Sequence, residues 1–186
     1  MMRRYIFPFM ILLTAGVCIG WILHVPRFAK NPNAPLPVDA QIIYSSANPD
    51  WAALKRVPVA ETLAPVFPLL QTVEHAPLVL ATAPVGGRDR SDTLIVVSAI
   101  GCRALFLRHQ LALAPPSNVR QLRSYGAWPV WEITPPSTAP ARTRIRFSIT
   151  EGLLICAISD NSHDIYYLLD TLDRRRLSKS EQKEIR

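Results

Sequence analysis

The stretch RTRIRFSITEGLLICAI, residues 142–158, decides the fold of this chain. Arginine and apolar residues alternate along Arg142–Thr150, and this period of two places neighbouring side chains on opposite faces of a β-strand. Glu151 and Gly152 have turn chemistry, and the run Leu153–Ile158 that follows is apolar at every position. We therefore expect an antiparallel hairpin whose second strand is buried on both faces.

Further strands and helices flank this hairpin. Runs rich in Val, Ile and Leu between turn residues predict strands at Ala40–Ser46, Leu78–Ala83, Thr93–Ser98, Val119–Tyr125 and Trp128–Thr134. Apolar residues at helical spacing predict helices at Trp51–Arg56, Ala60–Leu70, Arg103–Leu113 and His163–Arg176. Pro65 and Pro68 should interrupt the second helix, and Asn161 or Ser162 should cap the last.

This order of elements predicts an α+β fold with a mainly antiparallel sheet and helices on one face. The strands LVLA, LIVV and LLICAI are apolar on both sides, so both faces of the sheet need a cover. A small domain with helices on one face would leave apolar sheet surface exposed. We therefore expect the uncovered face to associate with a partner.

The N-terminal part of the chain carries a long uncharged stretch. Tyr5–Val25 holds 21 residues without a formal charge, a length that as a helix matches the hydrocarbon core of a bilayer. The apolar run passes through its small residues, so we prefer an uncleaved anchor to a cleaved signal peptide or a lipoprotein at Cys18. Its short leader, residues 1–4, favours a cytoplasmic N-terminus. We expect a single-pass protein of the cytoplasmic membrane with its C-terminal domain outside, in the periplasm of a Gram-negative cell.

The chain after the predicted span divides into three parts. Residues 26–37, PRFAKNPNAPLP, hold four prolines and are expected to form an extended tether. The α+β domain covers residues 38–177, and residues 178–186 form a polar tail.

Most of the basic charge lies beside the predicted span. The formal net charge is +7, and residues 1–30 contain four basic residues and no acidic residue. The remainder holds 17 basic and 14 acidic residues, a net charge of +3. An almost neutral domain outside the cytoplasm argues against nucleic acid as a partner. The hydrophobic content of 49% argues against a disordered chain.

Two glycines of the span, Gly16 and Gly20, are four residues apart and share one helix face. Small residues at this spacing let a second membrane helix approach closely, so the pair is a candidate helix-packing site. The alternative is that glycine is simply frequent in membrane helices.

The alternation at the start of the central hairpin places Arg142, Arg144 and Arg146 on one strand face, opposite Ile145 and Phe147. This candidate basic surface is either the solvent side of the sheet or a contact for anionic lipid, an acidic glycan or a partner's carboxylate.

Cys102 and Cys156 are the cysteines outside the predicted span. Outside the cytoplasm they could form a disulfide. The alternative is burial as small apolar residues, which suits Cys156 in the middle of LLICAI.

The sequence offers no recognisable catalytic or metal-binding motif. It has no G-x-S-x-G, P-loop, dinucleotide fingerprint, C-x-x-C or H-E-x-x-H. Cys102 and His109 are two helical turns apart, about 10 Å, which is too far for a hydrogen bond. We expect no catalytic residue, no cofactor and no metal.

A series of short motifs extends over residues 37–177, after the apolar anchor. They are P-x-D-A-x-x-x-Y (Pro37, Asp39, Ala40, Tyr44), R-S-Y-G at 123–126, E-G-L-L at 151–154 and a leucine-rich helix. Their order resembles one half-module of signal-anchored bacterial envelope proteins that carry a domain of unknown function. The resemblance implies an envelope location and pairing with a second, similar half, and it implies no chemistry.

The sequence thus predicts a membrane-anchored, non-enzymatic envelope module. It would associate with another protein, or with itself as a homodimer, through its sheet face and its anchor, residues 5–25. The alternative is an envelope hydrolase or ligand-binding domain whose site is assembled from residues distant in the sequence.

Overall fold

The computed structural model describes residues 13–16, 31–57, 59–85, 92–135, 142–150 and 152–173. The predicted span and the polar tail lie outside these residues, except for 13–16, which are helical. Within the described ranges, no helix has both the length and the hydropathy that crossing a bilayer requires.

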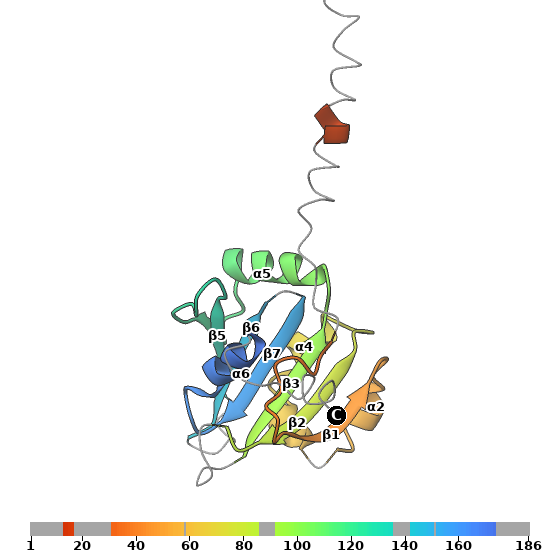
Figure 1. Cartoon of the computed structure of the whole chain (residues 1–186), viewed down its shortest axis with the longest axis vertical. Coiled ribbons are helices and arrows are strands. Elements are labelled where there is room, and N and C mark those ends of the chain that lie inside the picture. The colour runs from red at the N-terminus through yellow and green to blue at the C-terminus, as the bar shows by residue number, and fades with distance from the viewer. Residues whose placement is uncertain are drawn as a thin grey trace, which may run out of the picture.

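The described part of the domain is built on a seven-stranded antiparallel sheet with strand order β1-β2-β3-β7-β6-β5-β4 (Figure 1). The strands are β1 (Gln41–Ser46), β2 (Leu78–Ala83), β3 (Thr93–Ala99), β4 (Val119–Gln121), β5 (Val130–Ile133), β6 (Arg144–Ile149) and β7 (Leu153–Ser159). The helices are α2 (Trp51–Leu54), α3 (Ala60–Leu63), α4 (Phe67–Gln71), α5 (Arg103–Leu113) and α6 (Asp164–Leu172). The predicted α+β class with an antiparallel sheet is confirmed.

The central hairpin forms as predicted, with Arg146 opposite Ala157 and Phe147 opposite Cys156. Its second strand, β7, also pairs with β3, in a register that runs from Leu94 opposite Ile158 to Ala99 opposite Leu153. The middle strand of the sheet, β7, and its neighbour β3 are therefore buried at every position except their last. This pair joins the β1-β2-β3 part of the sheet to the β4-β5-β6-β7 part.

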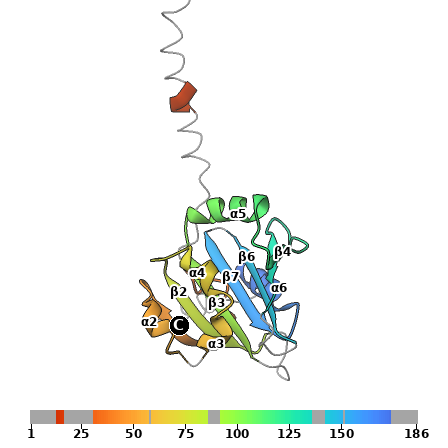
Figure 2. The ribbon, with the colours of Figure 1, turned by 180° about the vertical axis from the view of Figure 1, so that it is seen from behind.

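Short helices cover one face of the sheet (Figure 2). Leu54 of α2, Leu63 of α3 and Leu70 of α4 are buried in the cluster on this face. Leu107 and Leu111 of α5 join them. The sheet contributes to this cluster a stacked pair of rings from β5 and β6, Trp131 and Phe147, whose centroids are 5.4 Å apart.

The opposite face is covered as well, so the prediction of helices on one face is wrong. Helix α6 packs Ile165, Leu168 and Leu169 into a second buried cluster with residues of β2, β3 and β7 (Figure 1). Leu36, which precedes β1, is fully buried in the same cluster. Strands that are apolar on both sides need two covers, and this chain supplies both. Among the described residues, both sheet faces are therefore covered by the chain itself, and the open sheet face expected from the sequence is not seen.

Residues 31–37 also differ from the expected extended tether. Asn31 and Asn33 accept backbone hydrogen bonds from Ala34 and Leu36, respectively, which folds the segment into turns. The segment is folded because the Leu36 side chain is buried against the sheet, and this burial holds the segment in place.

The remaining elements differ from prediction mainly at their ends. The helix expected over Ala60–Leu70 is split into α3 and α4, as the prolines at 65 and 68 suggested. Helix α6 begins at Asp164, preceded by His163, and Asn161 does not cap it in the usual way. Instead, Asn161 Nδ2 donates to Asp164 Oδ1, and Thr93 Oγ1 donates to Asp164 Oδ2, both at 2.6 Å. This buried carboxylate ties the start of α6 to β3.

Candidate functional site

The arginines predicted as a basic surface lie at different depths. Arg142 and Arg144 are exposed, whereas the Arg146 side chain is only 14% exposed. Arg146 Nε donates to Glu132 Oε2 at 2.7 Å, and the guanidinium also donates to the backbone carbonyl of Ser162, just before α6. The three arginines therefore do not form one solvated surface, because Arg146 is held against β5 and the start of α6.

Glu132 of β5 is the centre of this ion cluster. Besides its bond to Arg146, it accepts a hydrogen bond from Arg120 at 2.6 Å, and Arg144 lies 4.0 Å away. Burial by itself would raise the pKa of Glu132, but the hydrogen bonds and charges of Arg120 and Arg146 outweigh it and hold that pKa below its ordinary value. The arginines thus compensate the buried carboxylate of Glu132, leave the cluster with a net positive charge, and fasten β4, β5 and β6 together.

The two cysteines are both free in the structure, so the candidate disulfide between Cys102 and Cys156 is not formed. Cys156 is fully buried on the α5 side of β7, as its apolar surroundings suggested. Burial raises the pKa of its thiol to about 12, which leaves it protonated and unreactive. Cys102 is exposed just before α5.

The predicted helix-packing pair falls mostly outside the described residues. Gly16 belongs to the helical residues 13–16, and a Cβ added there would meet no atom within 4 Å. Gly20 is not among the described residues. In the described ranges, no group of three or more His, Cys, Asp or Glu side chains is arranged to hold a metal ion.

The most distinctive surface of the domain is the outer face of α5. Among the described residues, three of the six large apolar side chains that remain exposed belong to this one helix. They are Leu105, Phe106 and Leu113, with exposed fractions of 45%, 72% and 73%. The opposite side of the helix buries Ala104, Leu107 and Leu111. Helix α5 is therefore apolar on both sides, a pattern typical of a helix that is covered twice.

An apolar hollow of about 280 Å³ lies on one flank of α5, between this helix and α4. Its lining includes Pro68 and Leu69 of α4, Leu107 and Leu111 of α5, and Phe147 of β6. None of the residues that line it has an ionisable side chain. The hollow is suited to apolar groups and has no means to move a proton.

A more open groove of about 420 Å³ lies on the other flank of α5, against the segment that links β4 and β5. Arg108 and His109 of α5 line it together with Ser124. Trp131 also borders the groove, and its buried Nε1 has no hydrogen-bond acceptor among the described residues. Helix α5 is thus a ridge with a depression on each side.

Another open feature is the edge strand β1, which among the described residues pairs on one side only, with β2. Its sequence, QIIYSS, contains no charged residue and no proline, which are the residues that usually protect an edge. Ile42 and Ile43 are 42% and 40% exposed beside a register shift between Ile42 and Tyr44. The free edge can accept another strand.

Sequence reasoning found the buried face of α5 and missed the outer one. The available signal was a set of further apolar residues: Leu105 and Phe106 lie between buried positions, and Leu113 follows the last of them. A second signal is that residues 93–131 contain four arginines and no acidic residue. Both patterns are visible in the sequence, although neither shows which side of the helix is exposed.

The α5 ridge, with its two depressions, and the free edge of β1 are therefore the surfaces that remain to be explained. No protein-family model, curated protein or solved structure matches this chain.

Proposed function

We propose that this chain is a membrane-anchored, non-enzymatic module of the bacterial envelope that associates with another protein or with a second copy of itself. Residues 5–25 would be the anchor in the cytoplasmic membrane, and the α+β domain would lie outside the cytoplasm. Because α6 and residues 31–40 cover the second sheet face, the proposed association surface is the sheet edge and not the sheet face.

The observation that carries this proposal is the free edge of β1. An uncharged edge strand exposes backbone N–H and C=O groups that can hydrogen-bond to a strand of another chain. Ile42 and Ile43 add apolar surface at the same place. If two copies met at β1, their sheets would join edge to edge, which is one way to supply the second half that the family resemblance implies.

The test is the mass of the full chain in mild detergent, measured by light scattering after gel filtration. We expect the wild-type chain to have the mass of a homodimer or to co-purify with a stoichiometric partner. The double variant Ile42→Lys and Ile43→Lys is expected to have the mass of a monomer and to co-purify with no partner. Thr62→Lys is the matched control, because Thr62 is an exposed residue of α3 and is not part of β1. A wild-type chain that runs alone as a monomer contradicts the proposal.

A second candidate function is binding of a small apolar ligand, favoured by the hollow between α4 and α5. Its volume is near the lower end of the range for ligand sites. Its apolar, uncharged lining favours a hydrocarbon group over a hydrolysable polar substrate. Titration with a fluorescent fatty-acid analogue tests this, with Leu69→Trp as the variant that fills the hollow. Equal binding by wild type and variant contradicts a ligand at this place.

A further inference from the structure

We infer that the outer face of α5 lies on the surface of the bilayer, with anionic phospholipid as its partner. The inference rests on the proposed function, because it requires the anchor at residues 5–25. It goes beyond that function by assigning a surface of the folded domain to the membrane.

The side chains on the outer face are those of an interfacial helix. Phe106 and Leu113 are the most exposed large apolar residues in the described part of the chain, and Leu105 lies beside them. Arg103 is exposed at the start of the helix, and Arg108 and His109 line the groove on its flank. Apolar residues that enter the headgroup region, flanked by basic residues that bind phosphate, are typical of helices that lie in the membrane interface.

The charge around α5 is complementary to anionic lipid. Residues 93–131, which include α5, β4 and the adjoining loop, contain four arginines and no Asp or Glu. One of these, Arg120, is paired with Glu132, whereas Arg103 makes a hydrogen bond to the uncharged backbone carbonyl of Glu74. Arg103 therefore keeps its positive charge available to a phosphate.

The length of chain before the domain brings the domain close to the bilayer. Six peptide steps separate Val25, the end of the predicted span, from Asn31, and six extended steps reach about 20 Å at most. From Asn31 onward the segment is folded, and Leu36 is fixed in the core. In Figure 1, the segment 31–40, in red, starts towards the α5 end of the sheet and ends at the opposite end, where β1 begins. The α5 end is therefore the end that the anchor holds at the membrane.

The direct test uses the full chain in nanodiscs made of phosphatidylcholine alone or mixed with phosphatidylglycerol. A nitroxide is attached at Phe106→Cys in a background with Cys18→Ala and Cys102→Ser. The control label is at Glu61→Cys, an exposed position on α3, which lies far from α5 in Figure 2. Collision with dissolved oxygen and with a water-soluble nickel chelate then reports whether each label is in lipid or in water.

We expect the label at position 106 to favour oxygen in the mixed nanodiscs and the label at position 61 to favour the nickel chelate in both. Equal access of the nickel chelate to both labels overturns the inference. Dipolar broadening of the nitroxide spectrum between two labels at position 106 also overturns it, because it would place a second copy of the chain on this face. Flotation of the same chain with vesicles separates the two proposals. A chain that floats while position 106 stays in water refutes only the α5 contact, and a chain that does not float refutes the anchor and the contact together.

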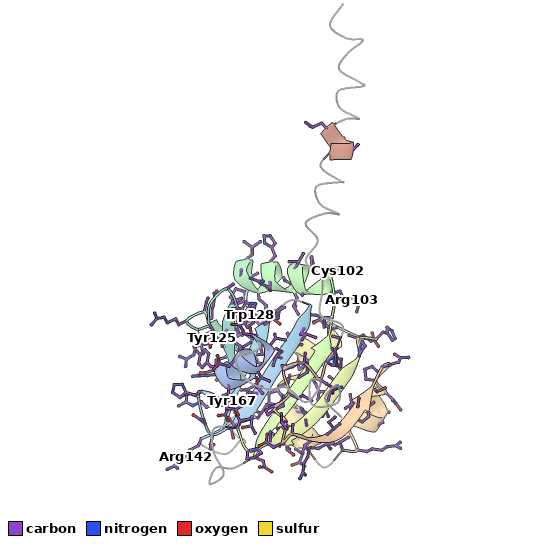
Figure 3. The ribbon with its side chains drawn as sticks, viewed as in Figure 1. Cys102, Arg103, Tyr125, Trp128, Arg142 and Tyr167 are labelled. Carbon is purple, nitrogen blue, oxygen red and sulfur yellow. The ribbon has the colours of Figure 1, made fainter. Side chains whose placement is uncertain are left out.

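Charge variants test the lipid specificity. Arg103→Gln is expected to lower the ratio of docked to undocked domain about fivefold in the mixed nanodiscs, the effect of about one arginine at an anionic surface. Arg142→Gln removes the same charge at the opposite end of the domain (Figure 3) and is expected to leave the ratio unchanged. Equal effects of the two variants overturn the assignment of α5 as the contact.

Discussion

Helices α5 and α6 both cover the sheet, and they present different surfaces to the outside. In α6, the apolar side chains are all buried or half-buried, with Ile165, Leu168 and Leu169 in the core. In α5, Phe106 and Leu113 remain almost three-quarters exposed although the helix also has a buried side. The difference shows that α6 buries its apolar face within the domain, whereas part of the apolar surface of α5 stays exposed, which supports the proposed contact outside the domain.

The largest expected effect compares the same substitution in the two helices. Leu168→Ala in α6 removes a fully buried side chain and should lower the free energy of unfolding by about 2–5 kcal/mol. Leu113→Ala in α5 should change it by no more than about 0.5 kcal/mol, because the side chain is exposed. Urea unfolding of the full chain in mild detergent measures both. Equal losses would mean that the two helices contribute equally to the core.

The next largest effect on the free energy of unfolding is expected at Asp164, the first residue of α6. Asp164→Ala leaves the Thr93 hydroxyl and the Asn161 amide without their carboxylate partner, so the free energy of unfolding should fall by about 1–3 kcal/mol. Asp39→Ala, at an exposed position before β1, is the matched control and should have little effect. If the two variants were equally stable, the buried carboxylate would not be what fastens α6 to β3.

A pH series tests the ion cluster beneath the start of α6. The folded-state pKa of Glu132 lies below its ordinary value of 4.5, so the carboxylate stabilises the fold above that value and loses this contribution as the pH falls through the folded-state pKa. Glu132→Gln should therefore cost about 1–3 kcal/mol at neutral pH and progressively less below pH 4.5. A difference between wild type and variant that does not change with pH would refute the charged state of the cluster.

The smallest effect on stability is expected at the outer face of α5. Phe106→Ser should change the free energy of unfolding in detergent by less than about 0.5 kcal/mol, since the ring has few intramolecular contacts to lose. The same variant should dock less well on anionic nanodiscs. A large loss of stability would show that Phe106 belongs to the fold rather than to a contact outside it.

The fold was predictable from the sequence where one local pattern determines one element. Strong local patterns mark the hairpin at residues 142–158, which begins with alternating residues, and the continuous apolar run at Thr93–Ser98. The strands of both segments form at the centre of the sheet. Which strand pairs with β1 was not predictable in this way, because β1 and β2 are separated by three helices. The cover of the second face was missed for a similar reason, since Leu36 lies within a proline-rich segment that resembles a linker.

The surfaces of the domain were harder to predict than its core. The alternation of arginines in β6 located a strand face correctly, but it could not show that Glu132, from another strand, neutralises Arg146. In α5, Leu105 and Phe106 resemble core residues in the sequence. Only the fold shows that they lie on the side away from the sheet cluster, because exposure depends on contacts between distant segments.

Amide hydrogen exchange of the full chain in nanodiscs tests the central claim most directly, because it compares α5 and α6 in one sample. The account predicts that peptides covering Arg103–Leu113 exchange more slowly on bilayers that contain phosphatidylglycerol than on phosphatidylcholine alone, whereas peptides covering Asp164–Leu172 exchange at the same rate on both. Identical exchange of α5 on the two bilayers would contradict the claim that anionic lipid covers its outer face.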